Sequence, residues 1–114
     1  MGANSSQTAT QSASDTVSET EREFHHLTGF QRDLLVALAD LEKPSGQTIK
    51  DQLEARLNKD ITHGRLYPNL DTLVTEGFVD KGAIDRRTNY YAISKTGQDA
   101  LAQYIEWAST HAED

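Results

Sequence analysis

Apolar residues recur at helical spacing in the first half of the chain. Thr28 can cap a first helix, and Gln31, three residues later, completes a capping box. The apolar face of this helix comprises Phe30, Leu34, Leu35, Ala37, Leu38 and Leu41. After a break at residues 44–46 the helical spacing resumes, which predicts a second helix that ends at Asn58. Its apolar positions are Ile49, Leu53 and Leu57.

A third helix and a hairpin are expected next. Thr62 is the natural cap of this helix, and Gly77 is its expected C-terminal residue. Its apolar face comprises Leu66, Leu70, Leu73 and Val74. From Phe78 the apolar period changes to two, which predicts strands over residues 78–81 and 88–93. The turn between the strands contains Gly82, Asp85, Arg86 and Arg87, so the hairpin has a basic tip.

The chain should end in one more helix, which Ser94 caps. The order is then helix, helix, helix, hairpin, helix, and only a few residues join the second helix to the third. This order predicts a mainly helical α+β fold: a winged helix-turn-helix with a two-stranded β-wing and a C-terminal dimerisation helix. We expect the winged-helix domain over residues 23–97 and the dimerisation helix over residues 98–114.

Residues 1–22 have a different composition. Ser, Thr, Gln and Ala dominate the first twenty residues, and Val17 is their only branched aliphatic. Such a segment buries too little apolar surface to offset the entropy lost on ordering. We therefore expect a disordered tail here.

Taken alone, the net charge of −7 argues against a nucleic-acid partner. Its distribution weakens that objection, because the ends of the chain hold it: residues 1–30 carry −3 and residues 98–114 carry −4. Residues 31–97 hold ten acidic and ten basic side chains. The acidic composition, with a pI near 4.9, favours an organism with a salt-rich cytoplasm. An ordinary acidic bacterial protein is the alternative.

Composition also excludes several kinds of site. The chain has no cysteine, so a disulfide, a cysteine-ligated zinc and a thiol nucleophile are impossible. His25 and His26 lie near acidic residues, but adjacent histidines do not share a helical face, so a solvated stretch is favoured over a metal or pH site. We expect no cofactor and no enzyme activity, since no nucleophile with an orienting partner is visible. No signal peptide or apolar span is visible, so a cytoplasmic protein without a membrane partner is expected.

Residues 46–97 resemble the PadR family of transcriptional regulators. The likeness is most specific at Thr62-His63-Gly64-Arg65-Leu66-Tyr67-Pro68-Asn69-Leu70, which matches the family's Gly-x-Leu-Tyr-Pro-x-Leu run. A Leu-x-x-x-Gly-Phe-Val continuation follows from Leu73, and residues 87–97 match the family's basic, Tyr-Tyr, aliphatic and Ser-x-x-Gly segment.

The resemblance implies a winged-helix fold, dimers formed through terminal helices, and binding to palindromic double-stranded DNA operators. It names no small-molecule effector. Many members of the family have a longer helical C-terminal region than this chain. With its acidic, cysteine-free composition, the chain is similar to the haloarchaeal members of the oxidative-stress type, which implies a stress response in a halophile.

Several polar residues of the third helix are left off its apolar face. We expect DNA contacts from Thr62, His63, Arg65 and Asn69. Arg can bind guanine with two hydrogen bonds, Asn can pair with adenine, and a helix N-terminus suits a phosphate. The alternative is that these are solvated polar residues and an N-cap. Tyr67 is equally expected to pack on the second helix or to reach a phosphate.

The wing offers further basic residues. Arg86 and Arg87 at its tip suit a minor groove or the phosphates beside it, and Lys81 suits a phosphate. A solvated hairpin tip is the alternative. Pro68 conflicts locally with the helix, because it lacks one backbone donor and crowds the preceding turn; Gly64 lies where that crowding would act.

The last helix has a wide apolar stripe, which a homodimer interface explains. The stripe comprises Leu101, Tyr104, Ile105, Trp107 and Ala108. Folding back onto the first helix of the same chain is the alternative, and both can hold together. For the whole protein, the alternative function is a winged-helix module that binds another protein and whose acidic ends repel DNA.

Overall fold

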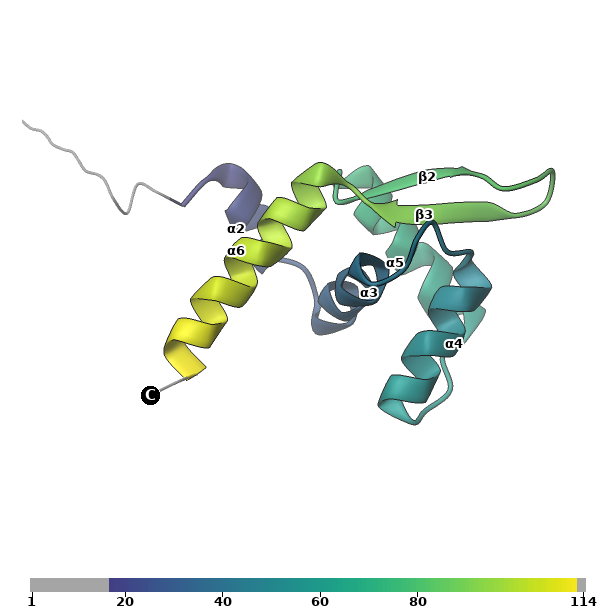
Figure 1. The fold of residues 1–114 in the computed structure, drawn as a ribbon, viewed down its shortest axis with the longest axis horizontal. Helices are drawn as coiled ribbons and strands as arrows, with labels where there is room; N and C mark the ends of the chain where they lie inside the picture. The colour runs from purple at the N-terminus through teal and green to yellow at the C-terminus, as the bar shows by residue number, and fades with distance from the viewer. Residues whose placement is uncertain (1–16, 113–114) are drawn as a thin grey trace, which may run out of the picture.

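The structure, a computed structural model, describes residues 17–112. Five helices and one hairpin occur in this part of the chain (Figure 1). In order they are α2 (Glu19–His25), α3 (Gly29–Ala39), α4 (Gly46–Leu57), α5 (His63–Thr75), β2 (Val79–Ala83), β3 (Asn89–Ile93) and α6 (Lys95–Ala112). The predicted winged-helix architecture is confirmed. None of the helices described is long and apolar enough to cross a membrane.

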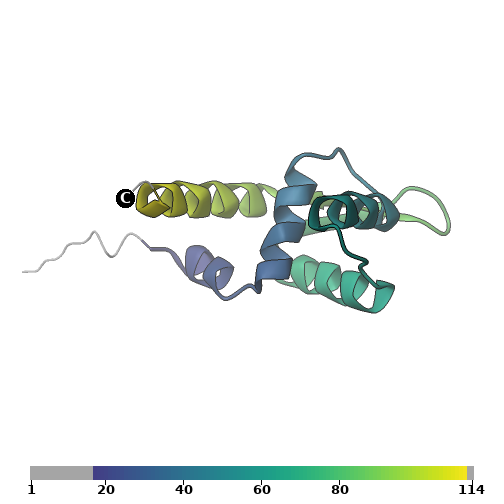
Figure 2. The ribbon, with the colours of Figure 1, turned by 90° about the horizontal axis from the view of Figure 1, so that it is seen from below.

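Helix α3 stands between two layers of the molecule. Figure 2 shows α2 and α6 on one side of α3 and α4 and α5 on the other, while the hairpin extends past α4 and α5 in Figure 1. Leu34, Leu35 and Leu38 of α3 are almost fully buried. Each such side chain contributes about 1.5–3 kcal/mol through burial. The rest of the core comprises Ile49, Leu53, Ile61, Leu66, Leu70, Leu73, Phe78, Val79, Tyr91, Ala100 and others packed around them.

The helices end at residues that the local sequence favours. The predicted capping box of α3 is present, since Thr28 Oγ1 accepts from the Gln31 amide and Gln31 Oε1 accepts from the Thr28 amide. Asn58 ends α4 with a left-handed φ of 54°. Gly77 follows α5 with a φ of +86°, and the Phe78 amide donates to the Leu73 carbonyl, as in a Schellman motif.

The hairpin is fastened to the loop before α4. Its register pairs Val79 with Ile93 and Ala83 with Asn89. The Tyr91 amide also donates to the Pro44 carbonyl over 2.9 Å, so β3 hydrogen-bonds on its other side as well. The wing is therefore held in a fixed place beside the start of α4.

The first strand differs from the prediction. Strand β2 begins at Val79 and runs to Ala83, whereas residues 78–81 were expected. Gly82 is part of the strand and not of the turn, because the Tyr90 ring of β3 covers it and fills the space of a Cβ atom. Phe78 instead lies in the core ahead of the strand.

Most of the predicted disordered tail of residues 1–22 lies outside the described residues. The prediction is wrong for residues 19–22, which are helical. Residues 19–25 form helix α2, with Ser18 and Glu21 in a capping box. Phe24 is buried and meets Phe78 edge to face, with 5.8 Å between the ring centroids. This aromatic contact gives the short helix the burial that its polar sequence lacks. Helix α6 begins at Lys95, so the expected division between residues 97 and 98 falls inside it.

Candidate nucleic-acid interface

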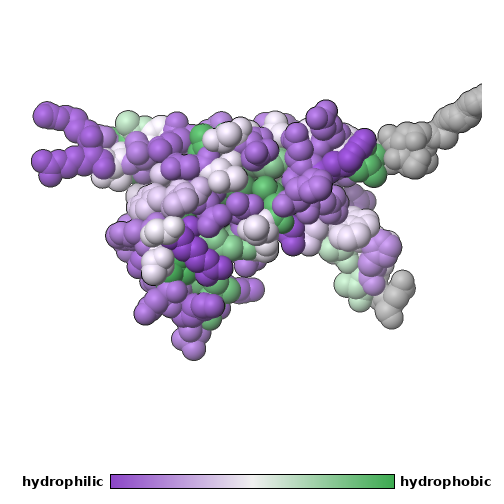
Figure 3. All heavy atoms as spheres, turned by 180° about the vertical axis from the view of Figure 1, so that it is seen from behind, coloured by the Kyte–Doolittle hydropathy of each residue, from purple (hydrophilic) through white to green (hydrophobic). Residues whose placement is uncertain are grey.

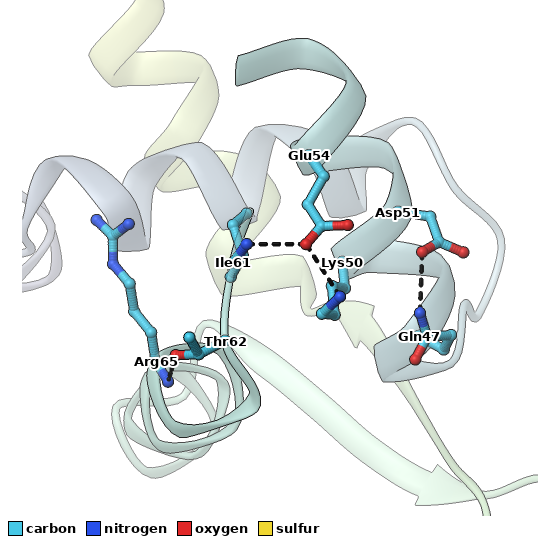
Figure 4. A network of polar contacts seen from close by, with 7 residues as sticks. All are labelled: Gln47, Lys50, Asp51, Glu54, Ile61, Thr62 and Arg65. Carbon is cyan, nitrogen blue, oxygen red and sulfur yellow. Dashed lines mark hydrogen bonds and ion pairs between the residues drawn. The ribbon is translucent and has the colours of Figure 1, made fainter. Parts of the chain in front are cut away.

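The turn between α4 and α5 is fixed by Glu54. Its carboxylate accepts from the Ile61 amide over 2.8 Å and from the Lys50 ammonium over 2.9 Å (Figure 4). The Ile61 hydrogen bond, followed by that of Lys50, holds the pKa of the Glu54 carboxyl below its ordinary value. The Ile61 side chain is buried in the core. Together these contacts set the angle at which α5 leaves the turn.

The N-terminus of α5 is exposed. Thr62 caps the helix, with its Oγ1 accepting from the Arg65 amide over 3.1 Å, and Thr62, His63 and Gly64 are all exposed. The amides of a helix's first turn carry partial positive charge, which suits a phosphate or a base acceptor. The end of α5 is therefore open to a nucleic acid.

The solvent face of α5 is centred on Gly64, Pro68 and Thr72. These three residues are exposed, whereas Leu66, Leu70 and Leu73 are buried on the opposite face. The helix continues through Pro68, and Thr72 Oγ1 donates to the Pro68 carbonyl over 3.0 Å. A Cβ added to Gly64 would have only Thr62 Oγ1 nearby, at 4.0 Å. The middle of this face therefore leaves room for another molecule to approach the helix closely.

Arg65 is exposed at the edge of this face. In Figure 4 its side chain extends away from the axis of α5. Its guanidinium Cζ lies 4.0 Å from the centroid of the Phe30 ring on α3. The stacked guanidinium keeps its N–H edge free for hydrogen bonds.

Asn69 is half-buried and uses both polar groups inside the protein. Its Nδ2 donates to the Arg65 carbonyl over 2.7 Å, and its Oδ1 accepts from Gln31 Nε2 over 3.0 Å. The sequence predicts Asn69 as a DNA contact, and in the structure each of its polar groups already has a partner within the protein. Gln31, which the sequence identified only as part of a capping box, gave no sign of this contact.

Tyr67 packs on the second helix, the first of the two roles expected for it. Its ring covers Gly46 at the start of α4, so that an added Cβ there would lie 2.5 Å from the ring. His63 meets the same ring edge to face, with 5.6 Å between centroids. Tyr67 also lines a cleft of about 460 Å³ that the start of α4 shares with Arg87, Thr88 and Asn89 of the wing. Because α5 and the wing both line this cleft, they lie on the same side of the molecule.

The wing tip is basic and exposed. Arg86 and Arg87 are exposed, and the tip protrudes as a hydrophilic knob in Figure 3. Asp85 Oδ1 accepts from the amides of Arg87 and Thr88 at 2.9 Å each, and these hydrogen bonds, led by that of Arg87, lower the pKa of the Asp85 carboxyl. Ile84 beside them is an apolar residue that no sequence pattern indicated, and it is 53% exposed.

Lys81 is placed between the wing and α5. Its ammonium lies 3.4 Å from Asp71 Oδ1 and 5.7 Å from the centroid of the Tyr91 ring. Both charged groups are substantially exposed, so this pair is weak and Lys81 can turn to a phosphate.

The apolar stripe of α6 is divided by depth. Leu101 is buried in the core of its own chain, which leaves it no surface for a second copy. Tyr104 and Ala108 are half-buried, whereas Ile105 and Trp107 are 51% and 52% exposed. His25 of α2, expected in a solvated stretch, lies edge-on to Trp107 with 5.2 Å between ring centroids. The later turns of α6 thus present large apolar side chains outside the core.

The comparisons with known proteins agree with this geometry. Residues 34–103 match the model of the transcriptional regulator PadR-like family. No curated protein matches the chain in sequence.

Solved structures give closer relatives. RosR of H. salinarum shares 43% identity over 75% of this chain and 77% of its own, with a TM-score of 0.72. A complex structure of hsRosR shares 40% identity over 82% of this chain and 80% of its own, with a TM-score of 0.77.

A PadR-like transcription factor from Bacteroides fragilis has the same fold, with a TM-score of 0.62 over 74% of this chain and 84% of its own, at 17% identity. The family match covers most of the chain and includes both α5 and the wing. These matches favour a DNA-binding regulator over the alternative of a module that binds only another protein. This chain belongs to the PadR-like family of transcriptional regulators and is a DNA-binding winged-helix regulator.

Proposed function

We propose that the protein binds a palindromic operator as a homodimer, with one α5 in the major groove of each half-site and the wing tip on the adjacent groove. The observation that carries this proposal is the open N-terminal end of α5 beside a basic hairpin tip, joined by the cleft that Tyr67 and Arg87 line. Two such units related by a two-fold axis would meet half-sites spaced by about one helical turn, roughly 10 bp.

Each proposed DNA contact has a distinct role. Arg65 is the base-reading residue, because its guanidinium is both exposed and held at one place. Thr62 and His63 meet the phosphate or base at the helix end, and Arg86 and Arg87 bind in or beside the minor groove. Lys81 and the Tyr67 hydroxyl are the phosphate contacts between these two regions. Asn69 is assigned to support of the helix, not to base recognition.

Replacing Arg65 tests the reading assignment. Loss of one bidentate base contact costs about 1–3 kcal/mol, so Arg65→Ala should lower affinity for the operator by about ten- to a hundredfold and leave non-operator binding almost unchanged. Fluorescence anisotropy on the footprinted promoter site measures both.

Arg56→Ala is the matched control, since Arg56 is an exposed arginine on α4 that lines the groove between α3 and α4. Equal operator affinity for Arg65→Ala and the parent would show that the reading face is assigned wrongly.

The acidic ends support function in a salt-rich cytoplasm, and H. salinarum RosR is the relative that bears on this. Release of counterions drives little binding at high salt, so specificity must rest on base contacts and DNA shape. Operator binding should persist from about 0.1 M to 2 M KCl; complete loss at the upper end contradicts this adaptation. The oxidative-stress role implied by the family resemblance stays a prediction. Measuring the transcript levels of target genes with and without an oxidant tests it.

A further inference from the structure

The first turn of α3 contacts α5 at the edge of its DNA-facing side. Phe30, the second residue of α3, is 9% exposed, and its ring faces the Arg65 guanidinium across 4.0 Å. A guanidinium over an aromatic face is attracted by the ring's negative charge distribution, and it also gains contact area. The contact therefore favours one position among the many that a free arginine side chain samples.

Gln31, the next residue, holds the backbone of α5 at the same place. Its Oε1 accepts from the Thr28 amide over 2.9 Å, and its Nε2 donates to Asn69 Oδ1 over 3.0 Å. The side-chain Nδ2 of Asn69 then donates to the Arg65 carbonyl over 2.7 Å. A continuous set of hydrogen bonds thus runs from the cap of α3 to Arg65.

Arg32, the fourth residue of α3, faces the layer formed by α2 and α6. The Arg32 guanidinium lies 5.2 Å from the centroid of the Tyr104 ring on α6, and its Nη1 donates to the Leu27 carbonyl over 2.6 Å. The turn that supports Arg65 is therefore itself held from the side of α2 and α6.

We propose that Phe30 and Gln31 are positioning residues of DNA recognition: Phe30 fixes the Arg65 guanidinium before DNA arrives, and Gln31, acting through Asn69, fixes the backbone from which Arg65 extends. The proposal rests on the proposed function, in which Arg65 reads a base. Its consequence is that sequence specificity depends on two residues of α3 that do not touch DNA.

The physical reason is the entropy of binding. An arginine that is already ordered loses less side-chain freedom on meeting a base, which improves affinity for the sequence it reads. Binding to non-operator DNA, which uses phosphates and requires no fixed guanidinium, gains little from the same order.

A double-mutant cycle tests this. Phe30→Leu should weaken operator binding by about three- to tenfold, with non-operator binding nearly unchanged, whereas Phe30→Tyr keeps the ring and should bind as the parent does. In an Arg65→Ala background, Phe30→Leu should have no further effect, because the residue through which it acts is gone. Phe78→Leu, the same change at another core aromatic, controls for lost stability.

The outcomes distinguish the reading role of Arg65 from the positioning role of Phe30. Unchanged operator binding by Arg65→Ala overturns the reading assignment and this inference with it. A different outcome is that Arg65→Ala weakens operator binding while Phe30→Leu weakens it by the same factor with and without Arg65, or by no more than Phe78→Leu does. In that case only the positioning role of Phe30 is wrong.

A measurement on the parent protein keeps the inference falsifiable if Phe30→Leu fails to fold. In the free protein, the ring current of Phe30 should shift the Arg65 side-chain proton resonances upfield of their positions in unstructured peptides. Phe30→Tyr should preserve the shift. Arg65 resonances at unstructured positions in the parent would overturn the proposal.

Discussion

Two glycines of the chain have opposite surroundings. A Cβ at Gly97 would overlap the Phe78 carbonyl oxygen and lie 2.9 Å from Ile93 Cγ1, whereas the space beside Gly64 is open. Gly97→Ala should therefore lower the free energy of unfolding by about 1–3 kcal/mol through overpacking. Gly64→Ala should raise it by about 0.5–1 kcal/mol, because alanine is the better helix former.

For Gly64→Ala, the effect on DNA binding should be opposite to the effect on stability. Gly64 lies on the exposed face of α5, so an added methyl group meets the DNA and weakens operator binding although the fold is more stable. Urea unfolding and anisotropy titrations on the same samples measure both quantities. A less stable Gly64→Ala protein would mean that Gly64 relieves the crowding at Pro68 instead.

Helix ends were predictable where the deciding contacts are local. Thr28, Asn58, Thr62 and Gly77 act on backbone groups within a few residues, and each ends or begins a helix as the sequence indicates. Helix α2 was missed because its burial depends on the distant rings of Phe78 and Tyr104, which contact Phe24.

The candidate DNA-binding residues show the same difference between local and long-range contacts. The exposure of Arg65 and the basic wing tip follow from periodicity and composition. The engagement of Asn69 with Gln31, 38 residues away, depends on how α3 crosses α5, which no local pattern encodes.

The α4–α5 turn should respond to acid through Glu54. Because hydrogen bonds from Ile61 and Lys50 lower the pKa of this carboxyl in the folded state, its contribution to stability is present above the ordinary value of 4.5 and is lost as pH falls through the folded pKa. The difference in melting temperature between the parent and Glu54→Gln should be constant at neutral pH and shrink below that range.

Thermal unfolding by circular dichroism from neutral pH into acid measures this difference. Glu42→Gln, in the loop before α4, is the matched control and should show no such convergence. A difference between parent and Glu54→Gln that is the same at every pH would show that the Glu54 carboxylate does not stabilise the turn.

At the scale of the whole molecule, the second half of α6 extends beyond the core and leaves apolar side chains exposed. Helix α6 has 18 residues, its last buried residue is Leu101, and the helix continues away from the core (Figure 1). Ile105 and Trp107 expose about half of their surfaces on this extension. A stable dimer buries roughly 800 Å² on each partner, and the exposed Ile105 and Trp107 side chains would supply the apolar part of such an interface.

Ile105→Glu should therefore give a monomer, because a charge at the centre of such an interface would be desolvated without a partner. Sedimentation equilibrium measures the mass, and footprinting of the operator should show loss of simultaneous protection of both half-sites. Val36→Glu is the control, since Val36 is 52% exposed on α3, away from α6. If Val36→Glu became monomeric while Ile105→Glu stayed a dimer, the interface would lie along the groove between α3 and α4, and each reading helix would face its half-site in a different orientation.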